Sequence, residues 1–438
     1  MGQTVAIDAR SLVARLSSLA GGAYLFERDT YLRFWLGRLT SHTAANAVLY
    51  ALLILVVRET GSAIHSSLFV VSYILPSAVL GSFSGVLADR VPKGLVLFGG
   101  NLARGVLAFL LIGSYESVWT LYGMGLLLAL ASQFISPAEG AALPLVVPRQ
   151  DLTAANAANN LGSLISQVAG MAVLAPLFLA LFVPPLFLVA AVLFFAGAVF
   201  FGTTLGFGFE SARGIRRVTV REVREQFARA WRTLSKDTPS YMSVIIVTLA
   251  SVTALVTVSL APRYVDGVLH VAPQWAIFVL SPAALGILGG MRLAPGLERF
   301  LSKAQIVALS FGVLVLGMVV IGMVKPVGAA FEDLFGLNAT GARLLVTSVF
   351  AVLLAGAYTL INIAARSIVN ERVPVEMQGR VFAAQVVLSN LASIAPILLT
   401  GAIAQVLGAD RIFVAVGVVV GVAAVWYWLR SRYSEAAP

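Results

Sequence analysis

Residues 85–93, with the sequence Gly-Val-Leu-Ala-Asp-Arg-Val-Pro-Lys, form a short island of charge between two long apolar runs, roughly 67–87 and 95–113. A helix that is apolar on all sides needs lipid or protein around most of its circumference. Two such helices joined by so short a polar turn cannot belong to separate soluble domains. The island therefore constrains the chain to fold as a bundle of membrane-spanning helices.

The composition supports this class and excludes several others. The 438 residues are 59% hydrophobic and 11% charged, whereas a water-soluble domain carries about a quarter charged residues. The chain has no cysteine, which excludes disulfides and thiolate chemistry. Its three histidines, His42, His65 and His270, are too scattered for a typical metal site, and the common nucleotide-binding, zinc-protease and serine-hydrolase motifs are missing. We expect no enzyme activity, no metal and no cofactor.

Apolar runs of about 20 residues, the length that crosses roughly 30 Å of hydrocarbon, recur along the whole chain. The predicted spans are 34–57, 66–88, 94–114, 118–143, 155–181, 184–206, 241–263, 274–294, 304–324, 343–369, 378–406 and 410–430. The predicted domains are a cytoplasmic arm at 1–33, a first six-helix bundle at 34–207, a cytoplasmic linker at 208–240, a second bundle at 241–430 and a tail at 431–438.

The basic residues indicate the orientation of the chain. Lys and Arg collect in the cytoplasmic loops of membrane proteins. Most of the 30 basic residues fall in loops and ends that lie on one side of the membrane if both termini are cytoplasmic. We predict that orientation, and the net charge of +10 then gives no reason to expect a nucleic-acid partner.

The linker carries a helical pattern. Its apolar residues recur at helical spacing while basic residues cover other faces: Val220, Val223, Phe227, Trp231 and Leu234 are apolar, and Arg221, Arg224, Arg229, Arg232 and Lys236 are basic. This pattern is typical of an interfacial helix on anionic inner-leaflet lipids. A solvated basic linker between two bundles fits the same residues, and both interpretations stay open.

The two halves of the chain share a sequence pattern, which indicates an internal repeat. Val147-Pro148 follows the fourth predicted span, and Val373-Pro374 follows the tenth. A long helix with a polar stripe comes after each: the first stripe is Asn156, Asn159, Asn160, Ser163 and Gln167, and the second is Gln385, Ser389 and Ser393. Corresponding polar helices in two bundles are the signature of transporters built from repeats around a site near the midplane of the membrane.

Several motifs resemble those of a known family. Gly85, Asp89 and Arg90, in the pattern Gly-x-x-x-Asp-Arg, resemble the loop between the second and third helices of the major facilitator superfamily, although Pro92-Lys93-Gly94 replaces the usual Gly-Arg-Arg. The superfamily's exporter branch, which contains enterobactin and macrolide exporters, is similar at three further places: Ser136-Pro-Ala138, Leu152-Thr-Ala-Ala-Asn156, and Asn370-Glu-Arg-Val-Pro374 followed by Gln378-Gly-Arg380.

The resemblance implies an all-α membrane protein whose twelve transmembrane helices form two pseudo-symmetric six-helix bundles and work by alternating access. It also implies a location in the bacterial cytoplasmic membrane. In that fold Asp89 would lie near the start of the eleventh helix, where the helix dipole and Arg380 would hold it as a latch on the inner side. Alternatively, Asp89 and Arg90 only cap helices and set the topology.

Charged residues inside spans are costly and usually functional. Glu139 lies inside the fourth span, toward its cytoplasmic end, and Arg104 lies at a comparable depth in the third. We expect these two residues to form a buried charge pair, as either a structural clamp or a gating switch.

The first span carries a polar stripe. Arg38, His42, Asn46 and Tyr50 are four residues apart and so share one helical face. The first, fourth, seventh and tenth helices line the cavity in the superfamily, so the resemblance implies that this stripe faces substrate. Histidine is a side chain suited to proton exchange, so His42 either carries a proton or only hydrogen-bonds a neighbouring helix.

Polar residues on other spans complete the predicted cavity: Asn160, Gln167, Tyr358, Asn362 and Gln385. Hydroxyls and amides among many apolar side chains fit an amphipathic or largely neutral compound. The alternative is hydrogen bonding between helices.

These features predict a secondary transporter that exports an amphipathic small molecule, such as a drug-like compound or siderophore, with protons as the coupling ion. A lysophospholipid flippase is the alternative within transport, because Tyr73-Ile-Leu and Lys93-Gly also resemble that group, although Ala45 stands where its members carry an aspartate. A membrane scaffold or receptor with a transporter-like fold is the alternative outside transport.

Overall fold

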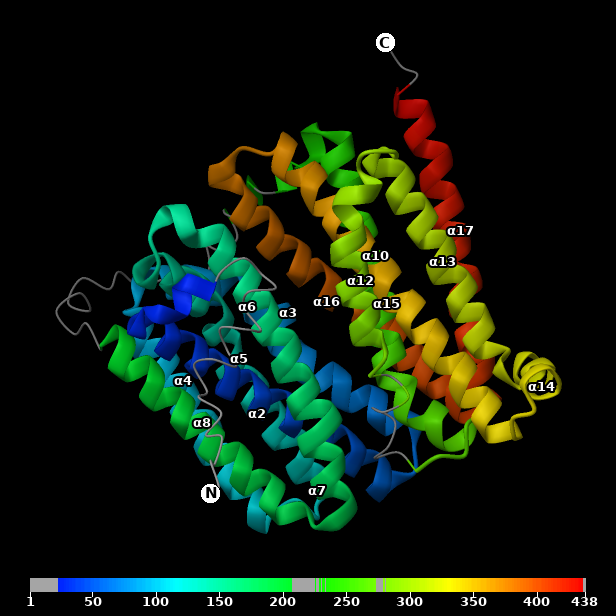
Figure 1. Ribbon diagram of the computed structural model, residues 1–438, viewed down its shortest axis with the longest axis horizontal. Coiled ribbons are helices and arrows are strands. Elements are labelled where there is room, and N and C mark those ends of the chain that lie inside the picture. The colour runs from blue at the N-terminus through cyan, green and yellow to red at the C-terminus, as the bar shows by residue number, and fades with distance from the viewer. Residues whose placement is uncertain are drawn as a thin grey trace, which may run out of the picture. The chain divides into compact units, whose positions relative to one another are not determined.

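The computed structural model describes residues 23–206, 225, 228–229, 231–232, 234–272, 279 and 281–435, without the side chains of 82–83, 85–90, 153, 334–335, 375–376 and 426–435. The described residues form helices and turns and contain no strand. Figure 1 shows the helices and their labels. The predicted all-α fold class is therefore confirmed.

The first half begins with a 3-10 turn, η1 (Ala23–Glu27), which leads directly into the first long helix. The helices that follow are α2 (Asp29–Thr60), α3 (Ala63–Arg90), α4 (Lys93–Leu110), α5 (Val118–Val146), α6 (Leu152–Gln167), α7 (Ala175–Leu181) and α8 (Val183–Leu205). A π-helix, η4 (Val168–Leu174), joins α6 to α7 within one predicted span. Short 3-10 turns, η2 (Leu111–Gly113) and η3 (Arg149–Asp151), end α4 and precede α6.

The second half contains α10 (Thr238–Gly267), α12 (Ala283–Leu297), α13 (Lys303–Gly322), α14 (Val324–Phe335), α15 (Ala339–Arg372), α16 (Val375–Leu407) and α17 (Ala409–Glu435). Among the described residues, ten helical segments are long and apolar enough to cross a membrane. The predicted spans 274–294 and 410–430 correspond to α12 and α17, each of which borders or includes residues left out of the description. The structure is thus consistent with twelve spans.

The Gly85–Asp89–Arg90 motif lies in helix and not in a turn. α3 continues to Arg90, and the break before α4 is confined to residues 91–92, where Pro92 has an extended backbone with ψ of 123°. A proline disfavours helical geometry at the residue before it, which explains why α3 ends there. The expected polar turn is therefore shorter than the charged island.

Contacts divide the chain into two compact units. The first comprises 1–51 and 83–218, and the second comprises 52–82 and 219–438. Residues 52–82, which the predicted domains placed in the first bundle, group with the second unit because they contact α10 and α16: the Ala63 N–H donates to Gln405, Ser66 donates to the Ser259 carbonyl, and Asn390 donates to Ser77.

Within the second unit, glycines bring α12 and α15 into close contact. A Cβ added to Gly286 would lie 2.0 Å from the Val352 carbonyl oxygen, and one added to Gly290 would lie 2.9 Å from that of Gly356. Backbones approach this closely in membrane bundles where both helices present small residues. α13 packs against α15 and α17 (Figure 1).

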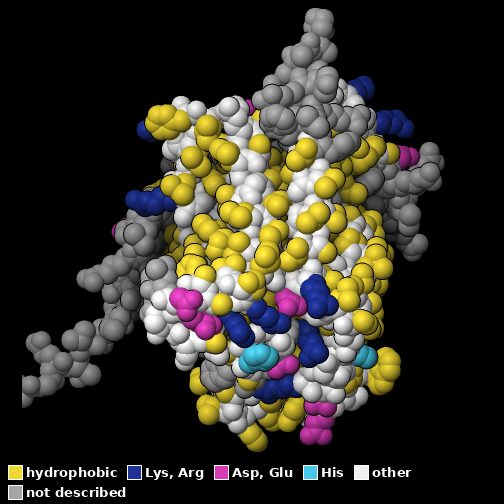
Figure 2. All heavy atoms as spheres, turned by 90° about the vertical axis from the view of Figure 1, so that its right-hand side faces the viewer, with side chains coloured by type: hydrophobic (Ala, Val, Ile, Leu, Met, Phe, Trp, Pro, Cys, Tyr) yellow, Lys and Arg dark blue, Asp and Glu magenta, His cyan; other side chains and the backbone are white. Residues whose placement is uncertain are grey.

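Two helical elements were absent from the prediction. The π-helix η4 was one, and the other is α14, which lies in a predicted outer loop and ends at Gly336 in the left-handed conformation (φ 62°). Figure 2 shows the face that carries α13 and α17, with hydrophobic side chains over its middle and charged side chains toward both ends. This distribution fits a helix bundle surrounded by lipid.

Candidate functional site

A buried carboxylate in the first unit is the centre of the candidate site. Glu139, on α5, is 5% exposed, and its Oε2 atom accepts a hydrogen bond from Arg38 Nε at 3.0 Å. The same oxygen lies 3.0 Å from His42 Nε2. Arg38 and His42 are one turn apart on α2, so both reach the same point on the facing helix. The structure thus joins half of the predicted polar stripe to the predicted buried acid.

Local packing explains how the charges come together. α5 presents Ala138 and Ala142, both fully buried, on either side of Glu139. The apolar residues Phe34 and Trp35 of α2 belong to the same hydrophobic core as these alanines. Small side chains on α5 and large ones on α2 allow close packing, and the three polar side chains then meet where the apolar contacts leave room.

Arg104 makes a separate network beside this cluster. It is 4% exposed and lies on α4. Its Nη2 atom donates to Ser41 Oγ at 2.5 Å and to Asn101 Oδ1 at 2.7 Å, and its guanidinium lies 4.7 Å from the Phe194 ring centre. The sequence predicted a direct Arg104–Glu139 pair; the ion pairs of Glu139 are formed with Arg38 and His42. The positive charge of Arg104 also acts on Glu139.

One oxygen of the Glu139 carboxylate can still accept hydrogen bonds. Glu139 Oε1 is buried and has no hydrogen-bond partner among the described residues. A buried acceptor without a partner is costly, because it has lost its hydration. A proton, or a hydrogen bond from a water molecule or a cargo donor, would therefore lower the free energy most at this atom.

A narrow crevice between α2 and α6 adjoins the cluster. It is lined by Trp35, Arg38, Leu39, His42, Asn159, Gly162, Ser163 and Ser166. Trp35 Nε1 donates to the Ala158 carbonyl at 3.1 Å, and Gly162 makes room for the indole, since a Cβ there would lie 2.9 Å from Trp35 Nε1. The polar stripe of α6 therefore faces α2 through Asn159, Ser163 and Ser166.

Other predicted cavity residues of the first unit lie elsewhere. Asn160 and Gln167 are exposed and do not line the crevice. Asn46 is half-buried, with its Cβ against Gly170 of η4, and Tyr50 is buried. Sequence reasoning missed Asn101, Ser41 and Ser132, which accept hydrogen bonds from Arg104. The available signal for Asn101 was its position one turn before the buried arginine; Ser41 and Ser132 lie on other helices and gave no such signal.

The end of the first unit that carries the start of α2 is tied to the α5–α6 turn. Tyr24 donates to Asp151 at 2.9 Å, and Arg28 lies 3.4 Å from the same carboxylate. The hydrogen bond to Asp151, together with burial and the nearby negative charge, raises the pKa of Tyr24. Phe26 packs edge-on against Trp35. The residues before α2 thus fix the helix that carries Arg38 and His42.

The second unit holds a smaller, uncharged polar cluster. Gln385 on α16 is 5% exposed and donates to Ser389 at 2.8 Å, and Ser389 donates to Thr248 on α10 at 3.3 Å. Gln385 Oε1 has no partner among the described residues. Tyr358 and Asn362 of α15 are half-buried, and the Asn362 amide donates to the Tyr358 carbonyl.

The predicted latch stays a prediction. The side chains of Gly85, Asp89 and Arg90 lie outside the described residues. Arg380 is exposed on α16, and its Nη1 atom lies 3.4 Å from Met377 Sδ.

The predicted linker is described only in part: residues 225, 228–229, 231–232 and 234–236 are helical. Leu234 is buried, and Trp231 packs edge-on against Tyr241.

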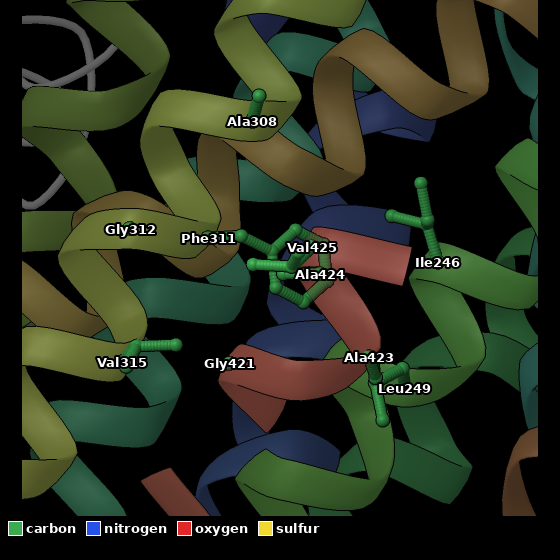
Figure 3. A pocket seen from close by; sticks show the side chains of 10 residues that line it. All are labelled: Ile246, Leu249, Ala308, Phe311, Gly312, Val315, Gly421, Ala423, Ala424 and Val425. Atoms are coloured by element: carbon green, nitrogen blue, oxygen red, sulfur yellow. The ribbon is translucent and has the colours of Figure 1, made fainter. Parts of the chain in front are cut away.

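An apolar groove opens on the surface of the second unit (Figure 3). Its wall is formed by α10, α13 and α17, and the Phe311 ring projects into it beside Ala424 and Val425. Ten residues line it: Ile246, Leu249, Ala308, Phe311, Gly312, Val315, Gly421, Ala423, Ala424 and Val425. The lining offers no charged or hydrogen-bonding side chain, so the groove suits a hydrocarbon chain.

A bundle of apolar spans with ionisable side chains buried between its helices is typical of integral membrane transport proteins. The chain belongs to the Major Facilitator Superfamily, because the model of that family matches residues 34–396. The resemblance read from the motifs is therefore confirmed, and the protein is a transporter of this superfamily rather than an enzyme.

Relatives and solved structures agree with this family. An uncharacterized MFS-type transporter, YfiS, of Bacillus subtilis (strain 168) is 25% identical over 370 residues, which cover 81% of this chain and 82% of the relative. Macrolide efflux protein A of Streptococcus pyogenes is 28% identical over 127 residues, or 28% of this chain and 31% of that protein.

Among solved structures, a mutant of the nucleoside transporter NupG has a TM-score of 0.74 at 11% identity, covering 91% of this chain and 99% of its own. A bacterial homologue of the iron transporter ferroportin has a TM-score of 0.66 at 13% identity, covering 91% and 98%. These similarities establish the fold.

Proposed function

We propose that the protein exports an amphipathic small molecule across the cytoplasmic membrane by alternating access, driven by protons that enter at Glu139 and His42. The observation that carries this proposal is the single carboxylate oxygen contacted at 3.0 Å by both Arg38 and His42. A buried ionisable group inside a membrane bundle marks an ion or proton pathway by default.

The chemistry of the cluster explains how a proton could change the conformation. While Glu139 is ionised, its charge holds Arg38 and His42, and with them α2, against α5. Adding a proton to Glu139 removes the attraction, and leaves Arg38 without its counter-charge. A neutral Glu139 would therefore weaken the α2–α5 contact and favour a second arrangement of these helices.

Outward direction and a drug-like or siderophore cargo are also part of the proposal. Local similarity to macrolide efflux protein A and the exporter-like motifs support them. Both termini in the cytoplasm are supported by the distribution of Lys and Arg.

Proteoliposomes with an imposed pH gradient test the proposal. Wild-type protein should couple movement of an amphipathic dye to the gradient, while Glu139→Gln and His42→Gln should lose gradient-driven movement by about tenfold or more, because each removes an ionisable side chain from the cluster. Glu116→Gln, at an exposed position on the same unit, is the matched control and should behave as wild type. Full gradient-driven movement by both variants would remove this cluster from the coupling mechanism.

A lipid flippase is the second candidate, and the apolar groove on α10, α13 and α17 favours it. A groove on the bundle surface gives an acyl chain a lateral path that a water-soluble cargo does not need. Movement of a lysophospholipid in inverted vesicles, without dependence on a pH gradient and without movement of a lipophilic cation, would support the flippase. The opposite pattern would support the proton-coupled exporter.

A further inference from the structure

The cluster around Glu139 carries surplus positive charge. Arg38 and Arg104 are permanent cations, whereas Glu139 is the one carboxylate among the described residues of the cluster. The other packed elements add no charge: α6 contributes Asn159, Ser163 and Ser166, and α8 contributes Phe194. The cluster therefore has a net positive charge when His42 is neutral, and this net charge increases by one when His42 is protonated.

The accessible side of the cluster is the positive side. The side chains of Arg38 and His42 are 18% and 34% exposed, while that of Glu139 is 5% exposed and lies behind them. An approaching molecule thus meets a guanidinium and an imidazole before it meets the carboxylate.

The crevice between α2 and α6 is also lined by basic and hydrogen-bond-donating side chains. Its polar lining consists of Arg38, His42, the Asn159 amide and the Ser163 and Ser166 hydroxyls, all of which have hydrogen to donate, and it contains no carboxylate. Ser166 already donates to the Leu39 carbonyl and Ser163 to that of Asn159. Arg38 Nε and His42 Nε2 contact Glu139, so the donors that remain toward a ligand are the Arg38 Nη groups, His42 Nδ1 and the Asn159 amide.

We infer that Arg38 and His42 bind a single anionic group, a carboxylate or a phosphate, on an otherwise apolar cargo. This rests on the proposed transport function, whose cargo it specifies. An arginine fork matches the two oxygens of such an anion, and the net positive charge that Arg38, Arg104 and Glu139 carry together favours an added anion in a low-dielectric setting. The inference also changes the expected cargo from a largely neutral compound to one with a single negative charge. The earlier expectation came from the hydroxyl and amide side chains of other spans.

Anion binding and proton binding then favour each other. A protonated His42 adds a second positive donor toward the anion, and by linkage the bound anion raises the proton affinity of His42 equally. The charged groups that face His42 are Arg38 on its own helix, Glu139 on α5 and, through the field, Arg104 on α4.

The test is a ligand-induced thermal shift on the purified full-length protein, with three amphipaths that share a decyl chain: decanoate, decanamide and decyltrimethylammonium. Decanoate should raise the melting temperature most, and more at about pH 6 than at about pH 8. Arg38→Gln should weaken decanoate binding by about tenfold to a hundredfold, and Arg38→Lys by less. Arg33→Gln removes an exposed arginine from the same helix and should leave binding unchanged.

The outcomes separate this inference from the proposed function. Equal or greater stabilisation by the cationic or neutral compound, no stabilisation by any of the three, or undiminished decanoate binding to Arg38→Gln would overturn anion recognition. Proton-driven movement of a cationic dye in proteoliposomes would in that case leave the transport proposal standing. Selective decanoate binding without gradient-driven movement would leave the anion site standing and overturn proton coupling.

Discussion

At the scale of single residues, the first unit gives different partners to Arg38 and Arg104, two arginines that lie inside predicted spans. Arg104 donates hydrogen bonds to Ser41, Asn101 and Ser132 and lies over the Phe194 ring, while Arg38 pairs with Glu139. Depth along a span could be predicted from residue numbers. Whether Arg38 or Arg104 pairs with Glu139 depends on the distances between helices, which cannot be derived from residue numbers.

A residue-scale prediction concerns Asp237 at the start of α10. Burial raises the pKa of this carboxyl, but hydrogen bonds from the Ser240 hydroxyl and backbone and the charge of Arg372 outweigh it, so the pKa lies below the usual value. A depressed folded-state pKa means that the stabilisation is present at neutral pH and is lost as the pH falls through that pKa.

Asp237→Ala should therefore lower the free energy of unfolding by about 1 kcal/mol at neutral pH, the usual cost of losing a helix cap. The difference from wild type should shrink as the pH falls toward the folded-state pKa. Thermal unfolding in detergent across pH measures this, with Asp266→Ala, an exposed position at the other end of α10, as control. A difference that stays constant down to acid pH would contradict the charge-based explanation.

At the scale of elements, the predicted spans lie close to the observed helices because bilayer thickness sets their length. Span 118–143 corresponds to α5 (Val118–Val146) and span 184–206 to α8 (Val183–Leu205). The inward face of each helix was harder to predict. Asn159 faces α2 whereas Asn160 is exposed, and in a helix that is apolar on most sides the hydropathy pattern does not distinguish two neighbouring residues about 100° apart.

The π-helix η4 gives the element-scale prediction. Gly170 packs against α2 so closely that an added Cβ would lie 2.4 Å from the Thr43 carbonyl oxygen and 2.9 Å from the Ala47 nitrogen. Both contacts are to backbone, which cannot turn aside as a side chain can. Gly170→Ala should cost about 1–3 kcal/mol of stability through overpacking and should displace α2.

Gly140 offers the matched control, since an added Cβ there meets nothing within 4 Å. Gly140→Ala should be neutral or stabilising by up to about 1 kcal/mol, from the better helix propensity of alanine. The comparison uses melting temperatures of the two purified variants. Equal destabilisation by both would show that the tight Gly170 contact is not the cause.

At the scale of the whole molecule, family and fold followed from composition and motifs, whereas the grouping of residues 52–82 with the second unit did not. That grouping depends on contacts over more than 300 residues of sequence, such as Asn390 to Ser77 and the Ala63 N–H to Gln405. Single hydroxyls and amides of this kind occur throughout the chain, so nothing in the sequence singled them out.

The absence of cysteine makes this grouping testable with single reporters. A Cβ added to Gly401 would lie 2.2 Å from Ser67 Oγ, and Ser67 is fully buried. Ser67→Cys in an otherwise cysteine-free chain should react slowly with a membrane-impermeant maleimide, and adding Gly401→Val should speed the reaction several-fold by forcing the helices apart. Adding Gly379→Val, where a Cβ meets open space, should not. Equal labelling rates in all three would contradict the contact.

The tie between η1 and Asp151 has a practical consequence for anyone producing the protein. Leu25 and Phe26 are embedded among α2, α5 and α6 side chains, and Tyr24 and Arg28 are engaged on either side of them. An affinity tag or fluorescent fusion joined close to Ala23, or a truncation that removes 23–28, would alter the interior of the first unit and not merely its periphery. Labels placed after α17 avoid that damage.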